Sequence, residues 1–109
     1  MAIDFSTGYT KICEIAYNST YENALMRYYE LFRNSGKLSY SFSIGGYSFI
    51  LRLHLNYATA KLHYDILNSA GEFLISFAQL AEAPFNMLFL RNFAGYKMYF
   101  SNNKIYLKD

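Results

Sequence analysis

The sequence has few charged residues, and its two signs nearly cancel. Only 17% of the 109 residues are charged, against roughly 25% in an ordinary globular domain, and ten basic residues stand against eight acidic ones. The basic residues are scattered and form no stripe, so we expect no nucleic-acid partner. The acidic residues are dispersed as well, and their spacing indicates no paired-carboxylate site.

Cysteine and long apolar runs are also scarce. Cys13 is the single cysteine, which excludes an intrachain disulfide and a cysteine-rich metal site. No window approaches the roughly 20 apolar residues of a membrane span. The first residues lack the cationic and apolar order of a secretion signal. We therefore expect a protein that is made in the cytoplasm, does not associate with a membrane, and binds neither a metal nor another cofactor.

Aromatic rings are what the sequence has in excess. Aromatic residues make up 20% of the chain, as 12 tyrosines and 10 phenylalanines, and 53% of all residues are hydrophobic. This composition excludes intrinsic disorder, and the length allows a single domain over residues 1–109. Tyrosine suits half-wet surfaces and protein interfaces. The surplus of aromatic rings therefore favours a small domain that binds other proteins.

The first 37 residues are predicted to form a helical N-terminal segment. Ser19-Thr20-Tyr21-Glu22 has the form of a capping box, and apolar residues then recur at steps of three and four. Asn34-Ser35-Gly36 supplies a stop signal, so the pattern predicts a helix over residues 20–34. Residues 9–17 fit a helix or a strand equally well.

Residues 38–109 are predicted to form an antiparallel β-domain. Residues 38–44 alternate apolar side chains with serine, and Gly45-Gly46 then forms a two-residue hairpin turn. Fixing the register on this turn sets Phe42 opposite Phe49. A strand over residues 47–56 continues the alternation, with its apolar side chains on the same inner face.

Two further turns extend the pattern. The turn around Tyr57–Ala60 pairs Asn56 with Lys61, and the turn Asn68–Gly71 pairs Leu67 with Glu72. In these registers the outer face sets Arg52 opposite Asp65 and His54 opposite His63. The inner face receives the rings of Tyr40, Phe42, Tyr47, Phe49, Tyr64, Phe73 and Phe77.

The remaining sequence predicts three short strands, over residues 87–90, 96–100 and 105–107. Asn102-Asn103 forms a tight turn between the last two. The predicted fold class is therefore mainly β (α+β). It is a small antiparallel meander barrel or sandwich of about six or seven strands, with an N-terminal helix.

The best catalytic candidate is the polar group of Arg52, His54, His63 and Asp65 on the outer face. Two histidines across a ladder could hold a metal, or one could act as a general base. A suitable third ligand is lacking, and Asp65 is the natural partner of Arg52. We interpret the group as a polar ladder facing solvent or a partner, and we predict no catalytic residues.

The partner-binding residues are expected among apolar and tyrosine side chains outside the inner face. Ile50, Leu67 and Leu74 are apolar residues of the outer face, which either the helix or a partner covers. The tyrosines that we assign to partner contacts are Tyr21, Tyr29, Tyr57, Tyr99 and Tyr106.

Residues 38–107 resemble the baseplate plug proteins of contractile-tailed bacteriophages. The resemblance is carried by Phe42-Ser43-Ile44-Gly45-Gly46-Tyr47-Ser48-Phe49-Ile50-Leu51-Arg52-Leu53, followed by Asn56, Tyr64-Asp65-Ile66 and the turn at Gly71. It implies a small β-domain that sits at the tail hub and closes the end of the tube. It implies no catalytic residues, a place in the virion, and other tail or baseplate hub proteins as partners, with no small-molecule substrate.

The leading hypothesis is thus a non-enzymatic component of a tail baseplate. The alternative is a small inhibitory or immunity protein that blocks one enzyme by surface complementarity. A third hypothesis is a binder of single-stranded nucleic acid, whose bases would stack on the aromatic side chains.

Overall fold

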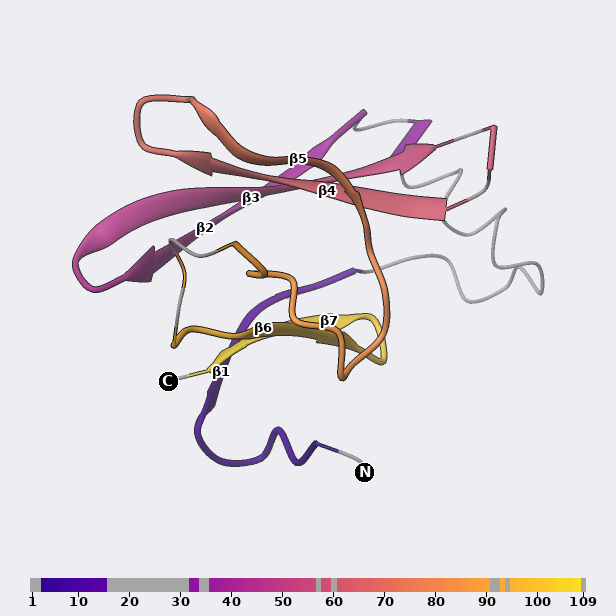
Figure 1. The fold of residues 1–109 in the computed structure, drawn as a ribbon. Helices are drawn as coiled ribbons and strands as arrows, with labels where there is room; N and C mark the ends of the chain where they lie inside the picture. Colours follow the sequence, from indigo (N-terminus) through magenta and orange to yellow (C-terminus); the bar gives the residue numbers. More distant parts are fainter. Residues whose placement is uncertain are drawn as a thin grey trace. The chain divides into compact units, whose positions relative to one another are not determined.

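The computed structural model describes residues 3–15, 32–33, 36–56, 58–59, 61–90, 93 and 95–108. The chain divides into two compact units, Ala16–Gln79 and Met1–Ile15 with Leu80–Asp109. The first holds a four-stranded sheet in the order β2-β3-β4-β5 and the second a three-stranded sheet in the order β1-β7-β6 (Figure 1). All strand pairs within the sheets are antiparallel, so the mainly β fold class is confirmed.

The four-stranded sheet is a meander of consecutive strands. The strands are β2 (Leu38–Ile44), β3 (Tyr47–Asn56), β4 (Lys61–Asn68) and β5 (Phe73–Gln79). Phe42 pairs with Phe49, as the Gly45-Gly46 turn predicts, and both glycines adopt positive φ.

The predicted register between β3 and β4 is confirmed along its whole length, from Asn56↔Lys61 to Phe49↔Asn68. Because side chains alternate between the two faces of a strand, this register buries Leu51, Leu53 and Tyr64 on the inner face. The core of this unit is therefore built from the residues that the alternation marks.

The predicted register between β4 and β5 is wrong. Leu67 pairs with Phe73, and not with Glu72 as the sequence predicts. The register then shifts between Leu67 and Ile66 and again between Ile66 and Tyr64, which pairs with Ala78. Each shift is a β-bulge, which adds a residue to one strand and turns the following side chain. Ile75 still reaches the core, but Phe73 and Phe77 are exposed and do not lie inside as predicted. Tyr47, also predicted inside, is exposed beside the hairpin turn.

The three-stranded sheet pairs the start of the chain with its end. Its strands are β1 (Tyr9–Glu14), β6 (Met98–Ser101) and β7 (Lys104–Lys108). The ambiguous region around residues 9–17 thus contains a strand. β1 pairs with β7, and the N–H of Ile15 donates to the carbonyl oxygen of Asn103 at 2.7 Å.

The turn between β6 and β7 lies at Asn102-Asn103, as predicted, and both residues have positive φ. The predicted strand over residues 87–90 is not formed. There, the side chain of Asn86 accepts hydrogen bonds from the N–H groups of Leu88 and Met98, both at 3.0 Å. An asparagine side chain therefore takes the place of a strand ladder in this segment.

Most of the predicted helix over residues 20–34 lies outside the described residues. Phe32 and Arg33 are helical, and the N–H of Gly36 donates to the carbonyl oxygen of Phe32 at 2.7 Å. Gly36 has a φ of 72°, the conformation in which glycine commonly ends a helix.

Burial of Cys13 should make the protein less stable in alkali. Burial raises the pKa of the Cys13 thiol from 9.0 to about 12. Above pH 9 the unfolded chain loses this proton while the folded chain keeps it, so the free energy of unfolding should fall as pH rises from 9 to about 12. Urea unfolding at pH 8 and pH 10.5 measures the loss. The Cys13→Ala variant should lose less between the two pH values, and an equal loss would contradict the assignment. Burial also raises the pKa of Tyr64, which supplies part of the alkaline loss in both proteins.

Candidate functional site

The candidate site is the outer face of the β2–β5 sheet, which we define by Arg52, His54, His63 and Asp65. The register of β3 and β4 places Arg52 opposite Asp65 and His54 opposite His63, as predicted from the sequence. The rings of the two histidines are stacked with their centroids 6.2 Å apart.

A bulge in β5 brings Phe77 onto this ladder. Ile66 pairs with Ile75 and Tyr64 with Ala78, so Asp65 stands opposite two residues of β5, of which Phe77 is one. Phe77 has a φ of 54°, in the left-handed region that glycine usually occupies in such bulges. For a side chain with a Cβ this conformation costs about 1–2 kcal/mol. The surrounding contacts must therefore hold Phe77 in place.

Asp65 supplies the main contact. Its Oδ1 accepts a hydrogen bond from the N–H of Phe77 at 2.7 Å, which satisfies a group that the bulge removes from the strand ladder. The Asp65 residue is only 3% exposed. The carboxylate is therefore a buried clamp on the backbone of β5, and the prediction that Asp65 belongs to a polar ladder facing solvent or a partner is wrong.

The predicted charge pair between Arg52 and Asp65 is not formed. The Arg52 guanidinium lies over the ring of Phe73, with Cζ 5.7 Å from the ring centroid, an arrangement typical of a cation–π contact. Asp65 Oδ2 instead lies 3.3 Å from Nε2 of His54, whose side chain is largely buried. This approach lacks hydrogen-bond geometry, so Nε2 of His54 is a buried nitrogen without a hydrogen-bond partner.

His63 contacts both the ring and the backbone of Phe77. The two rings are stacked with centroids 4.1 Å apart and planes 16° from parallel, and His54 lies 5.3 Å from the same ring. His63 Nδ1 is 3.2 Å from the carbonyl oxygen of Phe77. Because a carbonyl oxygen only accepts, we assign the proton of this contact to Nδ1 of His63.

The site thus combines a fixed aromatic ring, a cation on a second ring and a buried carboxylate. Among the described residues, no group of three or more histidine, cysteine, aspartate or glutamate side chains is arranged to hold a metal ion. Such an arrangement can bind another molecule through the flat rings and the guanidinium.

The apolar outer-face residues that we predicted as partner contacts differ in burial. Ile50 pairs with Leu67 across β3 and β4, so these two do lie together. Leu67 is buried at 3% exposure, whereas Ile50 and Leu74 are half-buried. The chain itself therefore covers Leu67, and only the other two present apolar surface.

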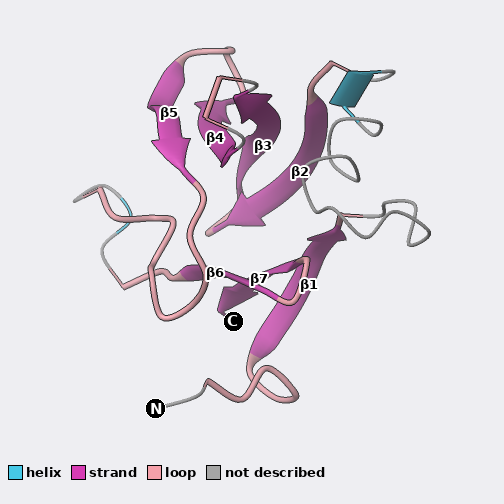
Figure 2. Ribbon diagram, turned by 90° about the vertical axis from the view of Figure 1, so that its right-hand side faces the viewer, coloured by secondary structure: helices cyan, strands magenta, loops and turns pink. Residues whose placement is uncertain are grey.

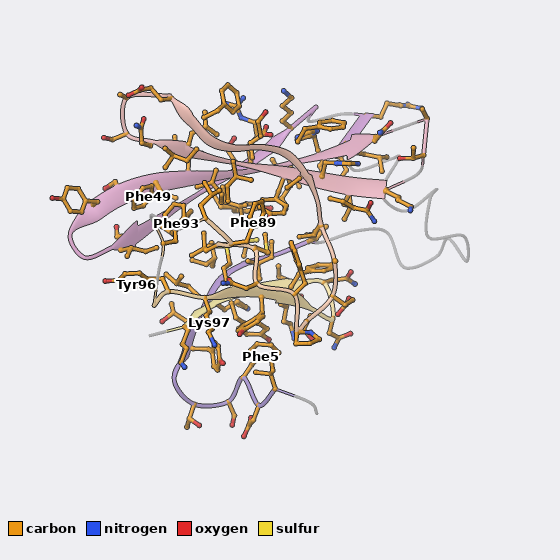
Figure 3. All side chains as sticks on the ribbon, in the orientation of Figure 1. Phe5, Phe49, Phe89, Phe93, Tyr96 and Lys97 are labelled. Carbon is orange, nitrogen blue, oxygen red and sulfur yellow. The ribbon has the colours of Figure 1, made fainter. Side chains whose placement is uncertain are left out.

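The predicted tyrosines fall into two groups. Tyr21, Tyr29 and Tyr57 lie outside the described residues. Tyr99 is buried and Tyr106 half-buried, and both belong to an aromatic cluster of the three-stranded sheet. The ring of Phe5, labelled in Figure 3, stacks on Tyr106 at 4.3 Å and contacts Tyr9 at 5.0 Å. These tyrosines therefore pack the N-terminal residues onto their own sheet.

Sequence reasoning missed the exposed phenylalanines of β5. Phe73 is 54% exposed and Phe77 is 53% exposed, although simple alternation assigns both to the core. Asp65 was the available signal, because a carboxylate within an apolar strand needs a buried donor. The donor in the structure is the backbone N–H of Phe77, on the next strand.

Comparisons with known proteins add no family to these observations: no family model matches the chain, and no similar curated protein or solved structure was found. Within the described part of the chain, no helix has the length and apolar character needed to cross a membrane. The functional argument therefore depends on the residues of the chain itself.

Proposed function

We propose that the protein is a non-enzymatic structural component of a phage tail baseplate, where it plugs or caps the tube or hub through contacts with other baseplate proteins. The resemblance of residues 38–107 to baseplate plug proteins supports the choice of assembly. In this proposal the protein is made in the host cytoplasm and ends in the virion.

The observation that carries the proposal is the exposure of large aromatic side chains. Among the described residues, the exposed ones are Tyr47, Phe73, Phe77, Phe89 and Tyr96. Aromatic residues are enriched at protein interfaces, where they leave water and contribute much of the binding energy. A permanent place in an assembly would cover some of these rings, Phe73 and Phe77 among them.

Sedimentation with intact tails tests the proposal. Tagged protein expressed during infection with the phage that encodes it should sediment with purified tails and stay attached in 0.5 M salt, because apolar contacts are little screened. Protein that remains in the soluble fraction would contradict the proposal. Capture of one soluble enzyme in its place would support the inhibitor hypothesis.

A further inference from the structure

We propose that Phe77, Phe73 and Arg52 form a docking surface for an acidic segment of a partner protein, one that carries aliphatic side chains between carboxylates. We call these three residues the β5 surface. The inference deepens the proposed function and rests on it, because it names the surface and the chemistry of the partner.

The backbone conformation of Phe77 supports a docking role for its ring. A left-handed backbone at a residue other than glycine persists only where its surroundings impose it, and such residues cluster at functional sites. Here Asp65 holds the N–H of Phe77, and His63 stacks on the ring and contacts the carbonyl oxygen. With these contacts in place, Phe77 is still 53% exposed. A rigid, exposed ring needs little ordering on binding, which is the property of an interface anchor.

The charged side chains around the β5 surface indicate the chemistry of the partner. Arg52 lies over Phe73, and exposed Lys61 follows on the same outer face, where it pairs with Asn56. Asp65 is the carboxylate of this face among the described residues, and it is buried and already bound to Phe77. Glu72 lies in the preceding turn, where its Oε1 accepts a hydrogen bond from Asn68 Nδ2 at 3.2 Å. Glu72 keeps its negative charge, so Arg52 and Lys61 stand against one exposed carboxylate, and this surplus of positive charge complements carboxylates on a partner.

The bulges of β5 determine how a partner can contact this strand. β5 is an edge strand of its sheet, beside β4 (Figure 2). A regular edge strand can bind a partner by strand addition, but bulges interrupt the hydrogen-bonding row of an edge. The register shifts along β5 therefore favour contacts through the side chains of the outer face.

The test is a titration of the isotopically labelled protein with three probes, in which NMR detects binding. The probes are a soluble peptide of alternating aspartate and leucine, the same peptide with lysine in place of aspartate, and an oligothymidine of matched charge. The acidic peptide should shift the amide signals of Phe73 and Phe77 and the Nε signal of Arg52. Equal affinity for the two peptides, preferential binding of the oligonucleotide, or no shift at these residues would overturn the proposal.

Variants identify the surface. Phe77→Ala and, separately, Phe73→Ala should each weaken binding of the acidic peptide at least about tenfold. Phe73→Ala leaves the left-handed residue intact, so it reports on binding even where Phe77→Ala is less stable. Tyr47→Ala, at another highly exposed ring, is the matched control and should bind as the wild type does. Unchanged binding by Phe73→Ala, or an equal loss in Tyr47→Ala, would overturn the proposal.

The peptide titration and tail sedimentation separate the two proposals. If the wild type sediments with tails but Phe73 and Phe77 play no part in peptide binding, the surface is wrong and the baseplate function stands. If the peptide binds through Phe77 and the protein never sediments with tails, the baseplate function is wrong and the surface stands.

Discussion

Replacing Asp65 with alanine is expected to lower the free energy of unfolding by about 1.5–3 kcal/mol, the typical contribution of a hydrogen bond to a charged acceptor. The N–H of Phe77, 2.7 Å from Asp65 Oδ1, would lose its acceptor. The bulge would then lack the contact that offsets the left-handed conformation of Phe77. Urea unfolding at pH 7 measures the change, and the amide signal of Phe77 should exchange with solvent faster.

Two controls separate the clamp from a general effect of aspartate. Asp65→Asn keeps a carbonyl oxygen that can accept from Phe77, so it should lose clearly less stability than Asp65→Ala. Asp4 accepts a similar bond from the N–H of Ser6 at 2.9 Å, but it is fully exposed. Asp4→Ala should therefore leave the urea midpoint unchanged. Equal losses in the alanine and asparagine variants at position 65 would argue against the hydrogen bond as the cause.

Replacing Leu53 with alanine is expected to destabilise the protein by about 3–4 kcal/mol, within the range of buried leucine truncations. Leu53 is fully buried and pairs with Tyr64, which is fully buried as well. The truncation removes apolar contacts and leaves a cavity beside a ring that cannot easily shift. A thermal or urea unfolding curve measures the loss.

Ser41→Ala is the matched control for Leu53→Ala. Ser41 lies on β2 of the same sheet and is exposed, so its hydroxyl group remains in solvent. The substitution should change stability by less than about 0.5 kcal/mol. A loss at position 53 as small as the loss at position 41 would contradict the inner and outer assignment of the strands.

The register of β2, β3 and β4 was predictable because two independent signals agree. Gly45-Gly46 fixes one hairpin through its turn, and strict alternation of apolar residues fixes the next. A slip by one residue would move every apolar side chain to the wrong face. Because such a slip would expose the apolar side chains to water, the register can be predicted from the sequence.

The register of β5 was not predictable in the same way. Its bulges depend on Asp65, which lies on another strand and accepts from Phe77 once the strands are paired. Alternation within β5 holds no trace of this contact. The sequence predicted which residues of β3 and β4 lie opposite one another. It did not predict that Arg52 contacts the ring of Phe73 and that Asp65 accepts a hydrogen bond from the backbone of β5.

The start of the chain shows a third limit. Residues 9–17 carry apolar side chains at spacings that fit a helix and a strand. β1 forms because β7, at the far end of the chain, offers an edge, and Tyr9 pairs there with Lys108. The spacing of apolar residues within β1 gives no information about a partner strand so distant in sequence.

The most direct test of the account compares variants of the β5 surface in tail sedimentation. The protein carrying both Phe73→Ala and Phe77→Ala should stay in the soluble fraction, while Tyr47→Ala should sediment with tails as the wild type does. Circular dichroism confirms that each variant is folded before the comparison. The account would be contradicted if the double variant sedimented with tails as fully as the wild type.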